Sequence, residues 1–249
     1  MPRNAQLIVV AIRGTASIHD WLVNFNTGEH SDTSAEDEDS ILNGNNYRAH
    51  AGFLACTMEM LPEACKAITK AATDFRGGGT PRTPWDLHLV LTGYSAGGAV
   101  AAMLYAQFMQ SQAAPTAQPS IPREELAGIH CVTFGAPPIT TTPIVPFAPD
   151  SLFLSIVNEG DPIPRADSPY FDDLLKIVVT GWPTESRAKW QLSPRKYFNA
   201  GTVLIVPRGR SVVYFLPSET GNGSLAETIM GNPGMHRMRW YLEGQGGQD

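Results

Sequence analysis

Residues 87–99 read Leu-His-Leu-Val-Leu-Thr-Gly-Tyr-Ser-Ala-Gly-Gly-Ala, and this stretch decides the fold of the chain. Its first six residues form a largely apolar run, which is typical of a parallel strand buried on both faces. The pattern Gly-x-Ser-x-Gly follows at once around Ser95, and the composition after it favours a helix that begins near Ala96. The stretch therefore predicts a strand, a tight turn and a helix, with Ser95 in the turn.

The serine in this turn is the predicted nucleophile. So tight a turn forces Ser95 into a strained backbone, and larger residues at positions 93 and 97 would collide with the neighbouring helix and strand. Ser95 Oγ would then stand at the helix N-terminus, where the helix dipole favours developing negative charge. The alternative is a glycine-rich turn with an incidental serine. The strand and the helix on either side favour the nucleophile.

Three more apolar runs predict further strands of the same sheet, at residues 6–12, 129–134 and 152–157. Residues 52–73 repeat apolar side chains with a period near 3.6, and residues 96–112 are rich in helix formers. Strands that alternate with helices predict an α/β fold, with a mostly parallel central sheet and helices on both of its faces.

The remaining segments fit a single domain of residues 1–249. One α/β domain often has about 200–250 residues, and no second core follows any loop. Residues 202–206 and 211–216 flank Pro207-Arg208-Gly209-Arg210, which predicts a β-hairpin near the end of the sheet. Three segments with loop composition are predicted as excursions from this domain: residues 27–46, 113–122 and 137–150.

Chain order selects the partners of Ser95. Where this turn carries a nucleophile, the acid follows it and the histidine comes last. Only His236, in a Gly-Asn-Pro-Gly-Met-His loop, follows the last predicted strands. Asp161 lies just beyond the strand 152–157, so we expect it at the same rim of the sheet as Ser95. His236 is the predicted base, and Asp161 would hold its imidazole and stabilise the imidazolium.

Simpler roles exist for several of these residues. Asp161 precedes a proline and would also serve as a turn former. His88 and His130 lie within predicted strands, where a structural histidine is the simpler interpretation. Other acidic residues are further candidates for the acid: Asp150, Glu159, Asp167, Asp172, Asp173, Glu185 and Glu219, with Glu124 and Glu125 nearer to the nucleophile.

Two backbone N–H groups are the predicted oxyanion hole. One belongs to Ala96, the residue after the nucleophile. The other belongs to Thr15, because the strand 6–12 ends in Arg13-Gly14-Thr15 and such a loop can reach the site. The alternative for this tripeptide is an ordinary turn at a strand end.

A short helix is predicted just after the Arg-Gly-Thr loop. Its apolar residues are spaced i, i+3, i+4 and i+7, which gives one apolar face. A helix hinged beside an oxyanion loop could cover the acyl site and open on a lipid surface. A helix packed permanently on the core is an alternative that the pattern favours equally. The predicted lid and acyl-site residues are Ile18, Trp21, Leu22 and Phe25.

Charge and composition exclude several other functions. A net charge of −6 offers no basic stripe for nucleic acid. No run approaches 18 apolar residues, so we expect no transmembrane segment. The three cysteines, Cys56, Cys65 and Cys131, are odd in number and lack CxxC spacing, which favours plain packing over disulfides or zinc. We expect no metal and no cofactor, and we read the acidic run 36–39 as a solvated loop. No signal peptide is visible, so a cytoplasmic location is expected.

Motifs in a fixed order extend along about residues 6–242. They are Ile12-Arg13-Gly14-Thr15 with Asp20-Trp21, His50-Ala51-Gly52-Phe53, Leu91-Thr92-Gly93-Tyr94-Ser95-Ala96-Gly97-Gly98-Ala99, Thr133-Phe134-Gly135-Ala136-Pro137, Asp161-Pro162-Ile163-Pro164-Arg165, and His236 with Tyr241. This series resembles the class 3 lipases, the fungal triacylglycerol lipase family.

The resemblance implies an α/β-hydrolase fold with the triad Ser95, Asp161 and His236. It implies Thr15 and Ala96 as oxyanion donors, and residues 16–26 fall where the family carries its lid. The expected activity is hydrolysis of acylglycerol esters, with transient contact to a lipid interface. A phospholipase, a feruloyl-type esterase or an acyltransferase would use the same triad, and a catalytically silent scaffold protein is the alternative outside enzymology.

The chain departs from the family pattern at three places. Family members usually have an N-terminal helix and one or two strands before the Arg-Gly-Thr strand, and we expect this sheet to lack them. Ala96 replaces a common Leu and Tyr94 a common His. Neither substitution removes a backbone donor, so we expect both to be tolerated.

Overall fold

The computed structural model describes a central sheet and helices packed on it. The described residues are 6–14, 39–42, 47–76, 87–110, 121–144, 151–167, 172, 179, 196–207 and 214–216.

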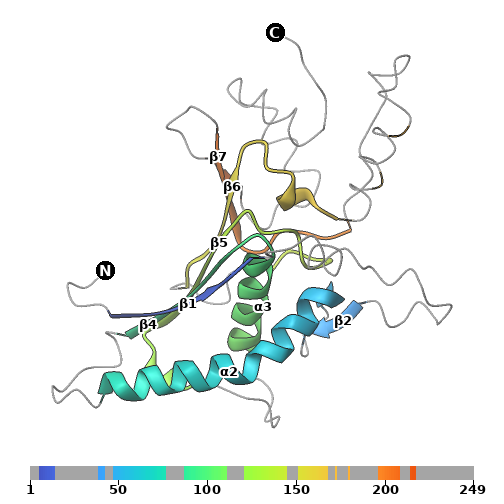
Figure 1. The fold of residues 1–249 in the computed structure, drawn as a ribbon. Coiled ribbons are helices and arrows are strands. Elements are labelled where there is room, and N and C mark those ends of the chain that lie inside the picture. The colour runs from blue at the N-terminus through green and yellow to red at the C-terminus, as the bar shows by residue number, and fades with distance from the viewer. Residues whose placement is uncertain are drawn as a thin grey trace.

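Among the described residues, six strands form the central sheet, in the order β1-β4-β5-β6-β7-β8 (Figure 1). Neighbouring strands run parallel from β1 to β7, and only β8 is antiparallel to its neighbour. The predicted mostly parallel sheet and its terminal hairpin are therefore confirmed. The strands are β1 (Gln6–Ile12), β4 (Leu87–Tyr94), β5 (Gly128–Phe134), β6 (Phe153–Asn158), β7 (Thr202–Val206) and β8 (Tyr214–Leu216).

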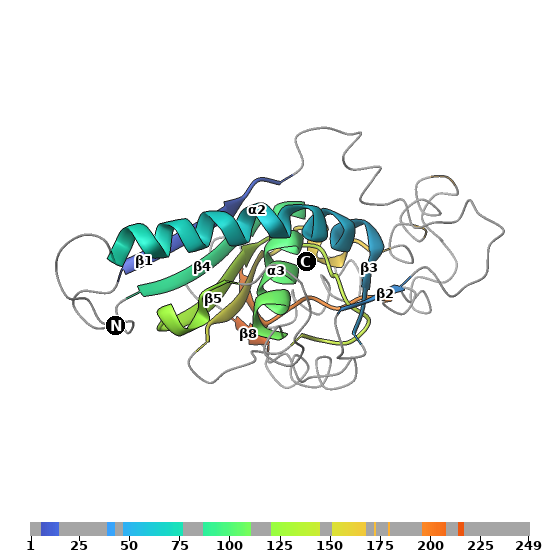
Figure 2. The same ribbon diagram turned by 90° about the horizontal axis from the view of Figure 1, so that it is seen from below.

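Two long helices connect the first three strands of this sheet. Helix α2 (Ala51–Arg76) precedes β4, and helix α3 (Ala96–Gln110) joins β4 to β5. Both were predicted from their periodicity and composition, and both are confirmed. Because the strand order advances in one direction, right-handed crossovers place both helices on the same face of the sheet. Figure 2 shows α2 and α3 together over β4 and β5.

The two faces of the sheet differ in burial. On β4 the side chains alternate, with Leu87, Leu89 and Leu91 buried toward the helices. Helix α3 is buried almost all round, which explains why its composition is nearly free of polar residues. On the other face of β1, Leu7 and Val9 remain 53% and 55% exposed. Among the described residues, the core therefore lies between the sheet and the helices.

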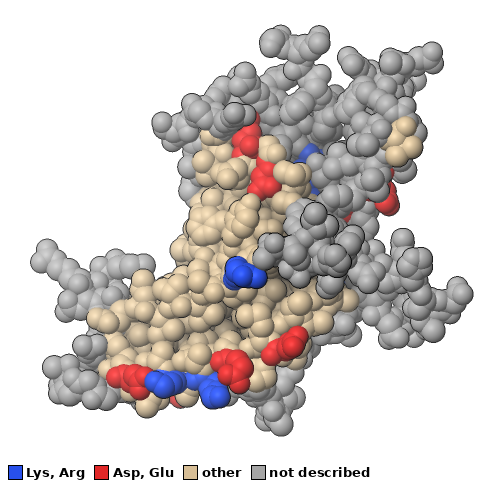
Figure 3. All heavy atoms as spheres, viewed as in Figure 1, with Lys and Arg blue, Asp and Glu red and all other residues tan. Residues whose placement is uncertain are grey.

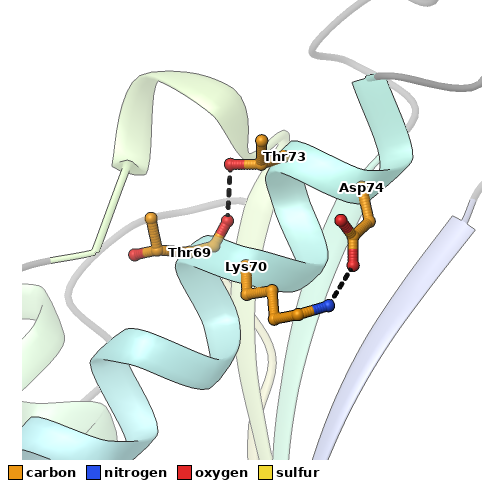
Figure 4. A network of polar contacts seen from close by, with 4 residues as sticks. All are labelled: Thr69, Lys70, Thr73 and Asp74. Atoms are coloured by element: carbon orange, nitrogen blue, oxygen red, sulfur yellow. Dashed lines mark hydrogen bonds and ion pairs between the residues drawn. The ribbon is translucent and has the colours of Figure 1, made fainter.

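Charged side chains line the solvent side of α2. Figure 3 shows acidic and basic side chains along the edge where α2 lies, and a mostly uncharged surface above it that is interrupted by a basic patch. Lys70 Nζ donates to Asp74 Oδ2 at 2.6 Å, and Thr73 Oγ1 donates to the carbonyl of Thr69 at 2.9 Å (Figure 4). The pKa of Lys70 is raised by its hydrogen bond and its attraction to Asp74. An exposed pair of this kind adds little to stability.

One predicted loop contains a strand. Residues 39–42 of the segment 27–46 form β2 (Asp39–Leu42), which pairs antiparallel with β3 (Tyr47–His50). The prediction of a loop was therefore wrong here, because the strand depends on pairing with β3 and shows no apolar run of its own. Two 3-10 turns, η2 (Arg123–Glu125) and η3 (Ile163–Arg165), precede β5 and follow β6. Neither described helix is long and apolar enough to cross a bilayer.

Candidate active site

The turn between β4 and α3 has the strained backbone that the sequence predicts. Ser95 has a φ of 53°, and it is the one non-glycine residue with positive φ among those the structure describes. Such a conformation costs an L-residue roughly 1–2 kcal/mol, so the surroundings must impose it. Its N–H donates to the carbonyl of Phe134 at 2.9 Å, and its own carbonyl accepts from the N–H groups of Gly98 and Ala99. The turn is thus held by β5 and by the first turn of α3.

Two glycines make this turn possible. A Cβ atom at Gly93 would overlap the carbonyl oxygen of Gly97 and lie 2.7 Å from the nitrogen of Gly98. A Cβ atom at Gly97 would overlap the carbonyl oxygen of Ile12 and lie 2.7 Å from the carbonyl carbon of Arg13. The predicted collisions at positions 93 and 97 are confirmed, and at both positions the obstacle is backbone.

The end of β1 lies directly beside the serine. A Cβ atom at Gly14 would stand 2.7 Å from the carbonyl oxygen of Tyr94 and 3.6 Å from Ser95 Cβ. The predicted oxyanion donor Thr15 is the next residue and lies outside the described residues. The other predicted donor, Ala96, is the first residue of α3, where N–H groups have no acceptor within the helix. In the described part of the chain, its N–H donates to no backbone carbonyl.

Asp161 lies at the same rim as Ser95. It follows the end of β6, where its N–H donates to the carbonyl of Asn158 at 3.1 Å and its Oδ1 accepts from the N–H of Ile163 at 3.0 Å. Its Oδ2 stands 2.7 Å from the point where Gly135 would carry a Cβ atom. Gly135 follows Phe134, whose carbonyl binds the N–H of Ser95. One backbone corner at the end of β5 therefore contacts both predicted catalytic residues.

Three of the other acidic candidates that the structure describes are placed less favourably. Glu124 and Glu125 precede β5, so they lie at the amino edge of the sheet, opposite the rim that carries Ser95. Asp167 is buried at 5% exposure, and its Oδ2 accepts from the N–H of Lys196 at 2.9 Å. Asp161 remains the predicted acid, with its carboxylate at the corner that also binds Ser95.

Several predicted site residues lie outside the described residues. These are the base His236, the oxyanion residue Thr15, and the lid and acyl-site residues Ile18, Trp21, Leu22 and Phe25. Their roles stay predictions. In the part of the chain that is described, no three His, Cys, Asp or Glu side chains gather as metal ligands would.

Two histidines and the cysteines occupy structural positions. His88 Nδ1 and His130 Nε2 lie 3.0 Å apart on β4 and β5, and His130 Nδ1 accepts from the N–H of Leu152 at 3.1 Å. Burial raises the pKa of Cys65 to about 11 and raises that of Cys131 further. Neither thiol is therefore a nucleophile at neutral pH. All three cysteines are free, as packing residues would be.

Gly135 is the site residue to which sequence reasoning assigned no role. It belongs to the motif Thr133-Phe134-Gly135-Ala136-Pro137, and its place just after a strand is the one signal that the sequence offers for it. The structure gives it a φ of 54° and sets it against Asp161, which is 26 positions away along the chain. Such a contact follows from the fold and not from local pattern.

Comparisons with known proteins point to one family. The profile of the family Lipase (class 3) matches residues 9–171. The triacylglyceride lipase of Rhizomucor miehei superposes with a TM-score of 0.52 at 16% identity, over 90% of this chain and 66% of that one. A search of curated proteins found no match.

Other solved lipases align less completely. Rhizomucor miehei lipase in its propeptide complex gives a TM-score of 0.47 at 15% identity, over 86% of this chain and 55% of that one. The lipase of Rhizopus microsporus var. chinensis gives 0.46 at 17% identity, over 88% and 61%. The chain therefore spans between 55% and 66% of the length of these three lipases.

Proposed function

Because this chain belongs to the class 3 lipase family, whose profile matches residues 9–171, we propose that it hydrolyses carboxylic esters through Ser95. The chain has the α/β-hydrolase fold, with the mostly parallel sheet and packed helices seen in the lipase of Rhizomucor miehei. That likeness supports the scaffold, and the chemistry is argued from the residues at its rim.

The proposed reaction has two steps. Ser95 Oγ attacks the ester carbonyl while His236 takes the hydroxyl proton, and the resulting oxyanion accepts hydrogen bonds from the N–H groups of Ala96 and Thr15. His236 then gives the proton to the leaving alcohol, and an acyl-enzyme remains on Ser95. Water repeats the attack with His236 as base and releases the carboxylic acid. Asp161 holds the imidazole and stabilises its protonated form throughout.

The observation that carries this proposal is the backbone at Ser95. A serine is held at a φ of 53° between two glycines that admit no side chain, at the first turn of a helix. Strain of this kind persists where the surroundings enforce it, and it is typical of active sites. The carboxylate of Asp161 at the same corner supports the assignment of the acid.

The proposed substrates are acylglycerol esters, met at a lipid interface. Family membership supports this class, and the exposed apolar side chains Tyr94 and Phe134 beside Ser95 fit an apolar acyl chain. A phospholipase or a feruloyl-type esterase would use the same groups. A series of p-nitrophenyl esters of increasing chain length, with and without a lipid interface, separates these classes. A lipase gains rate above the micellar threshold with longer chains.

A fluorophosphonate probe tests the nucleophile directly. We expect the wild-type protein to be labelled and Ser95→Ala to remain unlabelled, because the probe reacts with an activated serine. Ser155→Ala is the matched control, since Ser155 is a buried strand residue of β6 and its loss leaves Ser95 in place. Absence of labelling in the folded wild-type protein would overturn the proposal in favour of a catalytically silent lipase-like protein.

A further inference from the structure

The contact between Gly135 and Asp161 has a consequence for the proposed triad. Gly135 N–H donates to the carbonyl of Ile156 at 2.8 Å, so this corner is fixed to β6 as well as β5. A Cβ atom here would lie 2.7 Å from Asp161 Oδ2 and 3.4 Å from Tyr94 Cε2. Ordinary contacts of a methyl carbon are longer than the first of these distances. The carboxylate thus occupies the space that a side chain at position 135 would need.

We propose that Gly135 is a positioning residue for the acid. Because Gly135 has no side chain, the Asp161 carboxylate can occupy the space beside it. This inference rests on the proposed function, in which Asp161 orients His236.

A methyl group at position 135 would force the carboxylate to move away from its present position. Its Oδ1 is tied to the N–H of Ile163 at 3.0 Å, and its backbone N–H is tied to Asn158. The Tyr94 ring stands beside the same corner. An alanine at position 135 would therefore rotate Oδ2 out of the space beside residue 135 or break the hydrogen bond between Oδ1 and Ile163. Either movement misplaces the acid without touching Ser95 itself.

A matched control lies one residue before the acid. Gly160 also has a positive φ, at 87°, but nothing lies within 4 Å of the place where its Cβ atom would stand. Gly135→Ala and Gly160→Ala thus both place an L-residue at a positive φ, which is strained in either case. Only the first also meets a carboxylate, so the difference between them measures the displacement of Asp161.

The deciding experiment measures kcat and KM on a soluble p-nitrophenyl ester for both variants, in the wild-type and Asp161→Ala backgrounds. We expect Gly135→Ala to lower kcat about 10²-fold, the effect of misplacing a catalytic group by about 1 Å. KM should stay within about twofold, because substrate binding is not altered. In the Asp161→Ala background, the further loss from Gly135→Ala should equal that from Gly160→Ala, because no carboxylate remains to displace.

Two results would overturn the inference. One is an equal loss from Gly135→Ala in both backgrounds, which would make position 135 merely structural. The other is equal kcat for Gly135→Ala and Gly160→Ala in the wild-type background. If the wild-type protein neither hydrolyses esters nor takes the probe, the proposed function fails, and melting temperatures decide the steric claim. Gly135→Ala should then lower Tm more than Gly160→Ala does, and this excess should vanish in Asp161→Ala.

Discussion

The two ends of the central sheet are built in different ways. At the carboxyl ends of β1 and β4, backbone meets backbone, and glycines at positions 14, 93 and 97 leave no room for a Cβ atom. At the amino ends, the space near Gly128 is bounded by the imidazole rings of His88 and His130. The first kind of contact cannot yield, whereas side-chain rings can turn. The rim that carries Ser95 is therefore expected to tolerate much less change than the opposite edge.

This difference has a functional reason if Ser95 is the nucleophile. Catalytic groups must be held within a fraction of an ångström, and close backbone packing achieves this better than long side chains do. This close packing requires a positive φ at two residues, Ser95 and Gly135. At the amino edge, polar side chains satisfy one another, as His130 does with His88 and with the N–H of Leu152.

The largest expected effect comes from adding one methyl group at each end of the sheet. Gly97→Ala places a Cβ atom against the backbone of Ile12 and Arg13, so we expect the free energy of unfolding to fall by about 3 kcal/mol. Gly128→Ala meets His130 Nε2 at 3.1 Å and His88 Nδ1 at 3.3 Å, and these rings can shift. We expect it to cost at most about 1 kcal/mol. Urea unfolding measures both, and equal costs would contradict the contrast.

The next effect concerns activity. Gly14→Ala directs a methyl group at the carbonyl of Tyr94, beside Ser95, and should shift the end of β1 that leads to Thr15. Because one oxyanion donor is typically worth about 10²–10³ in kcat, we expect a loss of about 10²-fold on a p-nitrophenyl ester. Gly128→Ala should change kcat by less than about threefold, since it lies at the other end of the sheet. An unchanged kcat in Gly14→Ala would place the oxyanion loop elsewhere.

The sequence predicted those features of this rim that depend on residues close together along the chain. The strand before Ser95, the helix after it and the glycines at 93 and 97 all lie within one short segment, and their geometry was predicted. Asp161 was reached through the rule that loops after parallel strands share one rim. The contact between Gly135 and Asp161 joins residues 26 positions apart, and β2 forms by pairing with β3, so neither was visible from local pattern.

A smaller effect separates strain from chemistry at Ser95. Ser95→Ala and Ser95→Gly both remove the hydroxyl, so both should lose probe labelling and turnover. Glycine adopts a φ of 53° without strain, whereas alanine bears about 1–2 kcal/mol of it. Because glycine also gains entropy in the unfolded chain, we expect Ser95→Gly to be more stable than Ser95→Ala by only about 0.5–1 kcal/mol. Equal stability in urea unfolding would mean that the turn relaxes and holds no strain.

The smallest expected effect is a change in how the stability of the protein depends on pH, and it concerns the amino edge of the sheet. Leu152 N–H donates to His130 Nδ1, so the proton of the neutral ring sits on Nε2, from which it donates to His88 Nδ1. Burial, and next the charge of His88, lower the pKa of His130, while β1 and β6 carry no titratable side chain. The folded state therefore disfavours the protonated ring.

The hydrogen bonds of neutral His130 stabilise the folded state fully above the ordinary histidine pKa of about 6.5. This stabilisation is lost as the pH falls through the lower pKa that His130 has in the folded state. His130→Asn keeps an acceptor for Leu152 but cannot titrate. We expect its Tm to fall by a few degrees less than that of the wild-type protein between about pH 7.5 and about pH 5. Thr73→Ala, on the exposed side of α2, leaves both rings in place, so it is the control and should follow the wild-type pH dependence. Parallel Tm curves for the wild-type protein and His130→Asn would show that His130 protonates as easily in the folded chain as in the unfolded one, and that the amino edge adapts to charge as readily as it adapts to an added methyl group.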